Sequence, residues 1–177
     1  MLGYPLKILL SAIEKRFGQD AVLETLKEAG LPADRTYRLH ESYDDGEARR
    51  LSTAALQRLT VEDVAQAFFD DTLLRFPAWY AMCKTSRAFL EMQPEIHNTF
   101  GVGLQRPEDR DAVRTKFRLE KFEDELVVHY RSANRMCEIY KSIAQRVFQH
   151  YRETATLDER KCMNRGDEEC ELRIRWG

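Results

Sequence analysis

The chain has 177 residues, of which 43% are hydrophobic and 33% charged, and its formal net charge is -2 at pH 7. This size and composition suit one soluble globular domain or two tightly joined lobes. Interspersed charge argues against nucleic-acid binding, and no apolar run approaches the roughly 20 residues that span a bilayer. Without a recognisable signal peptide, we expect a cytoplasmic protein with no membrane or nucleic-acid partner.

The first half of the chain is predicted to be helical. Apolar residues recur at helical spacing from Leu6 to Phe17 and from Ala21 to Ala29, and Gly18 and Gly30 end these two helices. Thr60 has the character of an N-cap for a later helix. Further helices are expected over residues 48–59, 61–74 and 85–99, with a loop from Gly101 to Pro107.

The pattern changes to strand-like alternation at about residue 112. The expected elements are a hairpin over 112–130, a long helix over 134–154 and a second hairpin over 157–176. The predicted fold is therefore α+β, with a helical N-terminal lobe joined to a C-terminal lobe of four antiparallel strands and a long helix. In this arrangement His97 and Tyr130 meet between the lobes.

His97 and the run from Tyr130 to Arg135 are the residues most suggestive of chemistry. Tyr130 and Ser132, two apart at a strand end, put two hydroxyls on one side of the chain, and Arg135 lies just beyond. A neutral imidazole beside a clamp for carboxylates suits an iron porphyrin. Taken alone, a packed or solvated histidine is the commoner arrangement.

Over its whole length the sequence resembles the heme-nitric oxide/oxygen binding family, H-NOX, a gas-sensing domain related to the heme domain of soluble guanylate cyclase. The resemblance rests on the opening helix that ends at Arg16-Phe17-Gly18, the loop over 37–45, and the segment 89–97. That segment resembles the family's proximal helix, with His97 as the iron ligand. The resemblance implies a single domain over 1–177, with a helical lobe over 1–60 and a heme-side lobe with the sheet over 61–177.

The sequence departs from the family at the heme site. The signature Tyr-x-Ser-x-Arg has Asn134 at its arginine position, with Arg135 one place later, and asparagine cannot supply a forked, charged pair to a propionate. The first helix has Pro5 where the family has an aliphatic residue against the porphyrin. The linker from His97 to Tyr130 is also longer than expected. We therefore expect weaker heme retention.

Oxygen-binding members of the family carry a distal tyrosine nine residues after the signature tyrosine. In this chain that position is Ile139, and Tyr140 lies one place later, about 100° around the helix. The resemblance thus implies a sensor that binds nitric oxide and carbon monoxide and discriminates against oxygen. A one-residue irregularity in the helix would reverse this expectation.

Three cysteines form a second candidate site. Cys137 opens the long helix, while Cys162 and Cys170 flank the last hairpin turn, so the fold could bring three thiols together. Some H-NOX proteins carry a structural zinc at matching positions with a histidine as fourth ligand, where this chain has Glu159. Three thiolates and a carboxylate are less usual for zinc. Three buried thiols, or a redox pair among them, are the alternatives, and Cys83 is expected in the core.

The resemblance implies a heme b sensor rather than an enzyme. Nitric oxide would bind ferrous iron, the His97 bond would weaken, and the lobes would shift relative to each other. The implied partner is a histidine kinase or a cyclic-di-nucleotide-metabolising enzyme. The rival interpretation is a heme-free small-molecule-binding or adaptor module of the same superfamily, which Pro5 and Asn134 favour.

Overall fold

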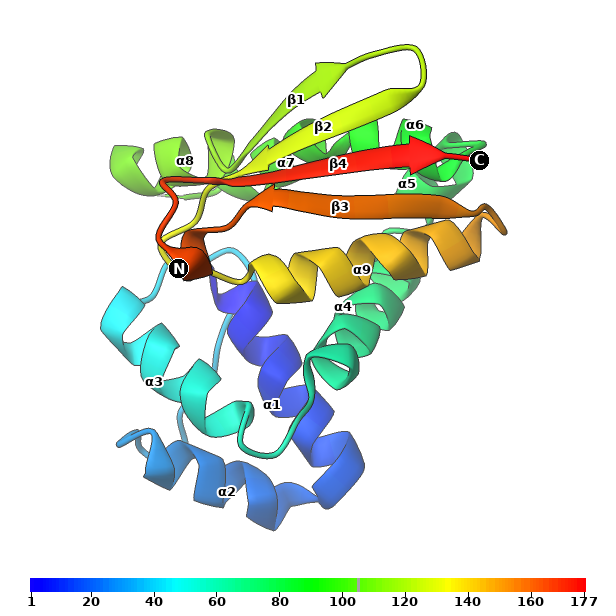
Figure 1. The fold of residues 1–177 in the computed structure, drawn as a ribbon. Coiled ribbons are helices and arrows are strands. Elements are labelled where there is room, and N and C mark those ends of the chain that lie inside the picture. The colour runs from blue at the N-terminus through cyan, green and yellow to red at the C-terminus, as the bar shows by residue number, and fades with distance from the viewer. Residues whose placement is uncertain (105) are drawn as a thin grey trace.

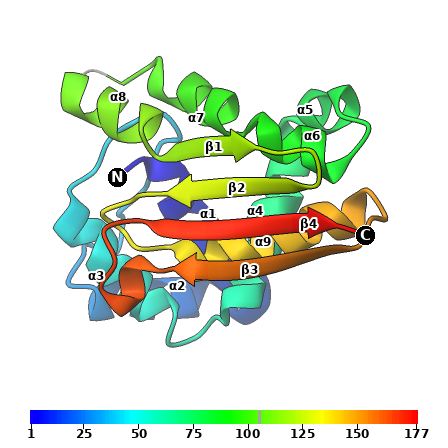
Figure 2. The same cartoon turned by 45° about the horizontal axis from the view of Figure 1, so that its top comes forward.

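The computed structural model describes residues 1–104 and 106–177. Within these residues the strands form one four-stranded antiparallel sheet in the order β1-β2-β4-β3 (Figure 1). Its strands are β1 (Phe117–Lys121), β2 (Glu125–Tyr130), β3 (Ala155–Lys161) and β4 (Cys170–Trp176). Helix α9 (Cys137–His150) runs along one face of the sheet and separates it from the N-terminal helices (Figures 1 and 2). The predicted α+β fold is therefore confirmed.

The N-terminal helices are α1 (Gly3–Phe17), α2 (Gln19–Glu28), α3 (Asp45–Ala55) and α4 (Val61–Arg75). Gly18 ends α1 at φ 86°, a left-handed conformation that favours glycine. The predicted N-cap Thr60 accepts a hydrogen bond from the Asp63 backbone, and the Asp63 side chain completes the capping box. Asp44 caps α3, so this helix begins at Asp45 instead of at the predicted residue 48.

The prediction of one continuous helix over 85–99 is wrong. It is divided into α6 (Ser86–Glu91) and α7 (Gln93–Gly101), and α5 (Pro77–Met82) precedes them. Pro94 lies in the first turn of α7, where its missing N–H is tolerated, whereas in the middle of a longer helix its ring would clash with the preceding turn. His97 therefore lies on the short α7.

The first hairpin is also shorter than predicted. Residues expected as strand from 112 onward belong instead to α8 (Pro107–Arg114), and β1 starts at Phe117. Pro107 in the first turn, Glu108 and Asp109 beside it and Arg114 in the last turn are helix signals that outweigh a brief alternation of apolar residues.

The predicted long helix over 134–154 is shorter at both ends. Arg135 precedes it at φ 49° and Arg152 follows it at φ 56°, and neither left-handed residue can continue a right-handed helix. The last hairpin contains the short helix η1 (Met163–Arg165) before its turn at Gly166. No helix of the described residues is long and apolar enough to cross a membrane.

Two apolar clusters hold these elements together. One joins the sheet to α9 and includes Leu126, Val128 and Leu172, and the other joins α1 to α2 and α3 and includes Leu6 and Leu51. Helices α1 and α9 contribute to both clusters. Tyr4 of α1 belongs to the cluster of the sheet, and Ile139 of α9 belongs to the cluster of the N-terminal helices. The boundary between the clusters is where the cavity described below lies.

Candidate functional site

A cavity of about 400 Å³ opens between the start of α1, α4, α7, the Tyr130 end of the sheet and α9. Its size lies within the usual range for small-molecule sites. Aromatic side chains supply much of its wall, and polar groups converge on it from α7 and from the segment after β2. The residues at issue here are Pro5, His97, Lys116, Phe117, Tyr130, Arg131, Ser132, Asn134, Ile139 and Tyr140, all of which line it.

His97 lies on the wall formed by α7. Its Nδ1 donates a hydrogen bond to the main-chain carbonyl oxygen of Gln93 at 3.1 Å, which fixes the tautomer and leaves Nε2 as the lone-pair nitrogen. Burial, with the positive charge of Lys116 as a second cause, lowers the pKa of His97 to about 3. The imidazole is therefore neutral near pH 7 and is equipped to ligate a metal through Nε2.

Tyr130 and Ser132 line the cavity where β2 ends. Tyr130 ends β2, and both residues are buried. Burial raises the pKa of Tyr130 to about 12, although hydrogen bonds from the Ser132 side chain and from the Met136 backbone oppose this shift. The two hydroxyls are thus held together as predicted from their spacing, and both remain neutral donors for an acceptor in the cavity.

Asn134 and Arg135 differ in their relation to the cavity. Asn134 lines the cavity, and its Oδ1 is buried without a hydrogen-bond partner among the described residues. Arg135 is exposed and lies outside the lining, with its carbonyl oxygen bonded to Asn164. The left-handed turn at Arg135 directs the chain into α9, and sequence spacing gives no sign of this turn.

Ile139 and Tyr140 line different sides of the cavity. Ile139 belongs to the apolar cluster of the N-terminal helices. Tyr140 stacks on Tyr130 at 5.8 Å between ring centroids, and its ring is 5.0 Å from Phe117, which itself lies 4.5 Å from His97. The Tyr140 hydroxyl is buried and has no hydrogen-bond partner in the part of the chain described.

Pro5 lines the cavity from the first turn of α1. A proline is accommodated there because the first N–H groups of a helix have no partner within the helix. The helix start is fixed by Gly3, where an added Cβ would lie 2.2 Å from the carbonyl oxygen of Arg38. This close approach holds the beginning of α1 against the loop that precedes α3.

Sequence reasoning missed Lys116, Phe117 and Tyr140 as cavity residues. Phe117 could have been found, because it opens β1 directly opposite Tyr130 in the sheet. Lys116 lies at a bend before β1, where strand alternation does not apply, and only the tertiary structure turns it toward His97.

A family model described as Haem-NO-binding matches residues 2–159. The chain belongs to this family, H-NOX. Its members are heme-binding gas sensors. No curated protein sequence matches this H-NOX domain.

Solved structures share the fold of this H-NOX domain. An H-NOX protein from S. oneidensis in the Fe(II)NO ligation state is 19% identical, with a TM-score of 0.80 and coverage of 100% of this chain and 99% of that chain. An oxygen-binding H-NOX domain related to soluble guanylate cyclases, in its oxygen complex, is 19% identical with a TM-score of 0.74, over 99% and 95% of the two chains.

The cavity of this H-NOX domain fits a porphyrin with carboxylate groups. It offers a neutral imidazole with Nε2 free of hydrogen bonds to the described residues, aromatic walls, and the hydroxyl donors of Tyr130 and Ser132. Asn134 Oδ1 and the Tyr140 hydroxyl are buried without hydrogen-bond partners among the described residues, so these residues leave polar groups of this space unsatisfied. These are the features that a ligand with both apolar faces and polar edges would satisfy.

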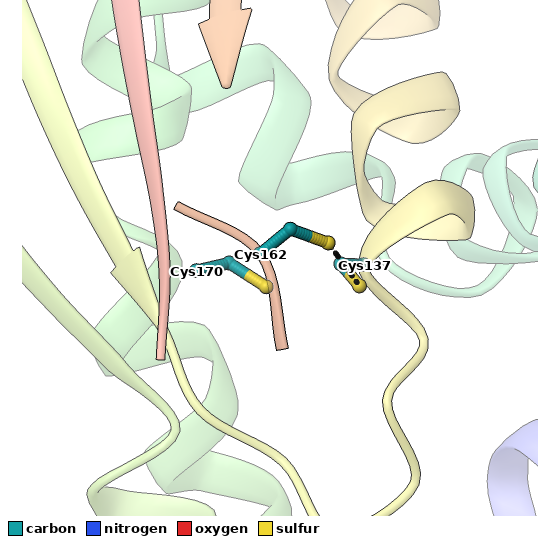
Figure 3. Close-up of side chains that lie close together, drawn as sticks. All are labelled: Cys137, Cys162 and Cys170. Carbon is teal, nitrogen blue, oxygen red and sulfur yellow. Dashed lines mark hydrogen bonds between the residues drawn. The ribbon is translucent and has the colours of Figure 1, made fainter. Parts of the chain in front are cut away.

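The three predicted cysteines come together where α9 begins, beside the turn between β3 and β4, as Figure 3 shows. Their sulfur atoms all lie within 4.8 Å of one another, the Cys137 and Cys162 sulfurs are 3.6 Å apart, and all three residues are buried. Burial raises the pKa of Cys137 to about 12 and also raises the pKa of Cys170. The Met163 backbone donates to Cys170 Sγ and Asn164 Nδ2 donates to Cys137 Sγ.

Glu159, the predicted replacement for a fourth histidine ligand, lies near Cys162 in a second group with Glu138. Its carboxylate is engaged by Lys141 at 3.2 Å and by Arg165 at 2.6 Å, and hydrogen bonds to these cations lower its pKa against the effect of burial. Glu159 is therefore adjacent to the three thiols but already neutralised by two cations.

Proposed function

We propose that this domain binds heme b with His97 as the axial ligand and senses nitric oxide and carbon monoxide. The observation that carries the proposal is the neutral His97 imidazole, whose Nδ1 is bonded to Gln93 and whose Nε2 has no hydrogen-bond partner among the described residues. When bound, ferrous heme supplies a coordination position for a diatomic gas. His97 would bind the heme iron through Nε2.

The hydroxyls of Tyr130 and Ser132 and the amide of Asn134 would donate hydrogen bonds to the propionates. The predicted role of Arg135 requires a different side-chain position from the exposed one described above. Asparagine cannot form the paired, charge-assisted hydrogen bonds that arginine makes with a carboxylate. Heme would therefore be retained weakly at this edge.

Discrimination against oxygen follows from Ile139 at the position nine residues after Tyr130. Its packing with the N-terminal helices supports an apolar wall on the side of the cavity away from the Phe117 and His97 rings. An apolar wall offers no hydrogen bond to a bound oxygen molecule. Pro5, on α1, would contribute to the same apolar surroundings.

The Tyr140 hydroxyl, which has no hydrogen-bond partner in the described part of the chain, favours a second candidate, in which the same site retains oxygen. A buried hydroxyl without a partner is available to donate to a polar ligand. Exposing the reduced, heme-loaded protein to air separates the two candidates. A stable oxygen spectrum that is lost in Tyr140→Phe would favour oxygen binding, and immediate oxidation in both proteins would favour discrimination.

We propose that His97 transmits the signal through α7, because this short helix contacts both α8 and β1. A change in the His97 bond would shift α7 relative to α1 and α9, within a single domain whose lobes comprise 1–60 and 61–177. The domain would act as a cytoplasmic sensor rather than an enzyme. Its output would reach a separate histidine kinase or cyclic-di-nucleotide enzyme.

We propose a structural zinc ion at Cys137, Cys162 and Cys170. Zn–S bonds of about 2.3 Å in tetrahedral geometry imply sulfur separations of about 3.8 Å, close to the 3.6 Å between Cys137 and Cys162. Glu159 or a solvent molecule would complete the coordination. The ion would join the start of α9 to the last hairpin turn.

The test is the absorption spectrum of hemin-loaded, reduced protein before and after nitric oxide, with His97→Ala measured alongside. A Soret band that moves with nitric oxide and is altered in the variant is expected. A wild type that takes up no stoichiometric heme would contradict the proposal and favour the heme-free binding or adaptor module.

A further inference from the structure

The cation expected at the carboxylate edge of the ligand is missing from its signature position. Asn134 occupies that position, and its amide can donate a hydrogen bond to a carboxylate but carries no positive charge. Arg135 is exposed outside the lining. A dianionic ligand bound in this cavity would therefore need another positive charge.

Two basic side chains besides His97 line the cavity within the described residues, and these are Lys116 and Arg131. They lie side by side, because the Arg131 N–H donates to the Lys116 carbonyl oxygen at 2.9 Å. Arg131 is exposed, whereas Lys116 is half-buried at the bend between α8 and β1. Lys116 is thus the basic residue held more firmly within the cavity.

The Lys116 ammonium makes no hydrogen bond or ion pair with the residues that the structure describes, although its surroundings disfavour the charged form. The carboxylates that line the cavity have other partners. Asp45 pairs with the Met1 ammonium at 2.8 Å, and Asp109 pairs with Arg106 at 2.7 Å. Lys116 is therefore available for an external anion.

We infer that Lys116 is the cation that binds a carboxylate of the ligand and thereby replaces the signature arginine. The inference rests on the proposed heme function and specifies one residue of that site. Burial lowers the pKa of Lys116, the Asp45 carboxylate opposes this shift from a distance, and a bound carboxylate would oppose it further. Lys116 and His97 line the same cavity and are not hydrogen-bonded to each other, so each side chain is free to contact a ligand there.

The experiment compares hemin with its dimethyl ester, which has the same ring and iron but no carboxylate charge. Equilibrium dissociation constants are measured by tryptophan fluorescence quenching on the purified, heme-free full chain. The proteins are the wild type, Lys116→Met, Lys116→Arg and Lys27→Met. Lys27 is an exposed residue of α2 outside the cavity lining and serves as the matched control.

Lys116→Met is expected to weaken hemin binding about tenfold or more and to leave binding of the ester unchanged. Lys116→Arg should retain most of the affinity, and Lys27→Met should match the wild type. Equal hemin affinity in Lys116→Met and the wild type would overturn the role assigned to Lys116 but not the proposed heme binding. An equal loss for hemin and the ester would also overturn it, because the lysine would then act through packing.

A wild type that binds neither porphyrin would instead overturn the proposed function and the role of Lys116 with it. Thermal unfolding of each variant, followed by circular dichroism, distinguishes loss of affinity from loss of fold.

Discussion

His97 Nδ1 donates to the carbonyl oxygen of Gln93 one turn earlier in α7, at 3.1 Å. This bond fixes the orientation of the ring with respect to its own helix. Because the bond uses Nδ1, the nitrogen that remains for a ligand is Nε2. Burial lowers the pKa of His97 to about 3, which gives the heme-free protein a testable pH dependence.

Acidification is expected to destabilise the heme-free protein through His97. The folded-state pKa is lowered from 6.5 to about 3, so the unfolded chain takes up the proton first and is favoured as the pH falls from about 6.5 toward 3. The slope from this residue is at most about 1.4 kcal/mol per pH unit. Urea unfolding of the wild type and His97→Gln at several pH values measures how the free energy of unfolding changes with pH.

Equal pH slopes in the two proteins would contradict the prediction. His150→Gln, a substitution at an exposed position, is the control.

Asn134→Arg is expected to strengthen heme retention. The substitution restores the charged, forked donor at the signature position, and a hydrogen bond to a charged group contributes about 1.5–3 kcal/mol, or roughly ten- to a hundredfold in affinity. Transfer of heme to an excess of a competing heme-binding protein measures the rate of loss. Arg135→Gln should lose heme at the wild-type rate, since Arg135 lies outside the lining. Faster loss from Arg135→Gln would mean that this side chain reaches the ligand.

Tyr140→Phe and Tyr80→Phe form a matched pair for stability. The Tyr80 hydroxyl is bonded to Thr72 at 2.8 Å, whereas the Tyr140 hydroxyl has no partner among the described residues. We expect Tyr80→Phe to cost about 1 kcal/mol and Tyr140→Phe to leave the heme-free protein unchanged or slightly more stable. Thermal unfolding should resolve the difference, at about 2–4 °C per kcal/mol for a chain of this size. Equal losses would indicate that the Tyr140 hydroxyl is hydrogen-bonded in solution.

One equivalent of zinc is expected to bind and to raise the melting temperature. Because burial raises the pKa of the Cys137 thiol to about 12, zinc must displace protons, and proton release in weakly buffered solution should accompany binding. Cys137→Ser should abolish both effects. Cys83→Ser is the control, because Cys83 is buried elsewhere, beside Met92. Undiminished zinc binding by Cys137→Ser would exclude this cysteine as a ligand.

Local signals in the sequence predicted much of the fold. Helices α1 and α2 follow from apolar spacing between glycine stops, and α4 follows from its Thr60 cap. The last hairpin follows from its turn at Gly166. Where two local signals competed, as in α8 and at the Pro94 break, the prediction failed, because short elements depend on packing as much as on propensity.

The sequence by itself determined the helical first half, the sheet and the spacing that brings the Tyr130 and Ser132 hydroxyls together, because these follow from the periodicity of a helix and a strand. It also identified His97 and the three cysteines by residue type. Only the tertiary structure decided that Lys116 lines the cavity and Arg135 does not, because a bend and a left-handed residue direct these side chains. Such directions depend on how distant segments pack, which no local pattern records.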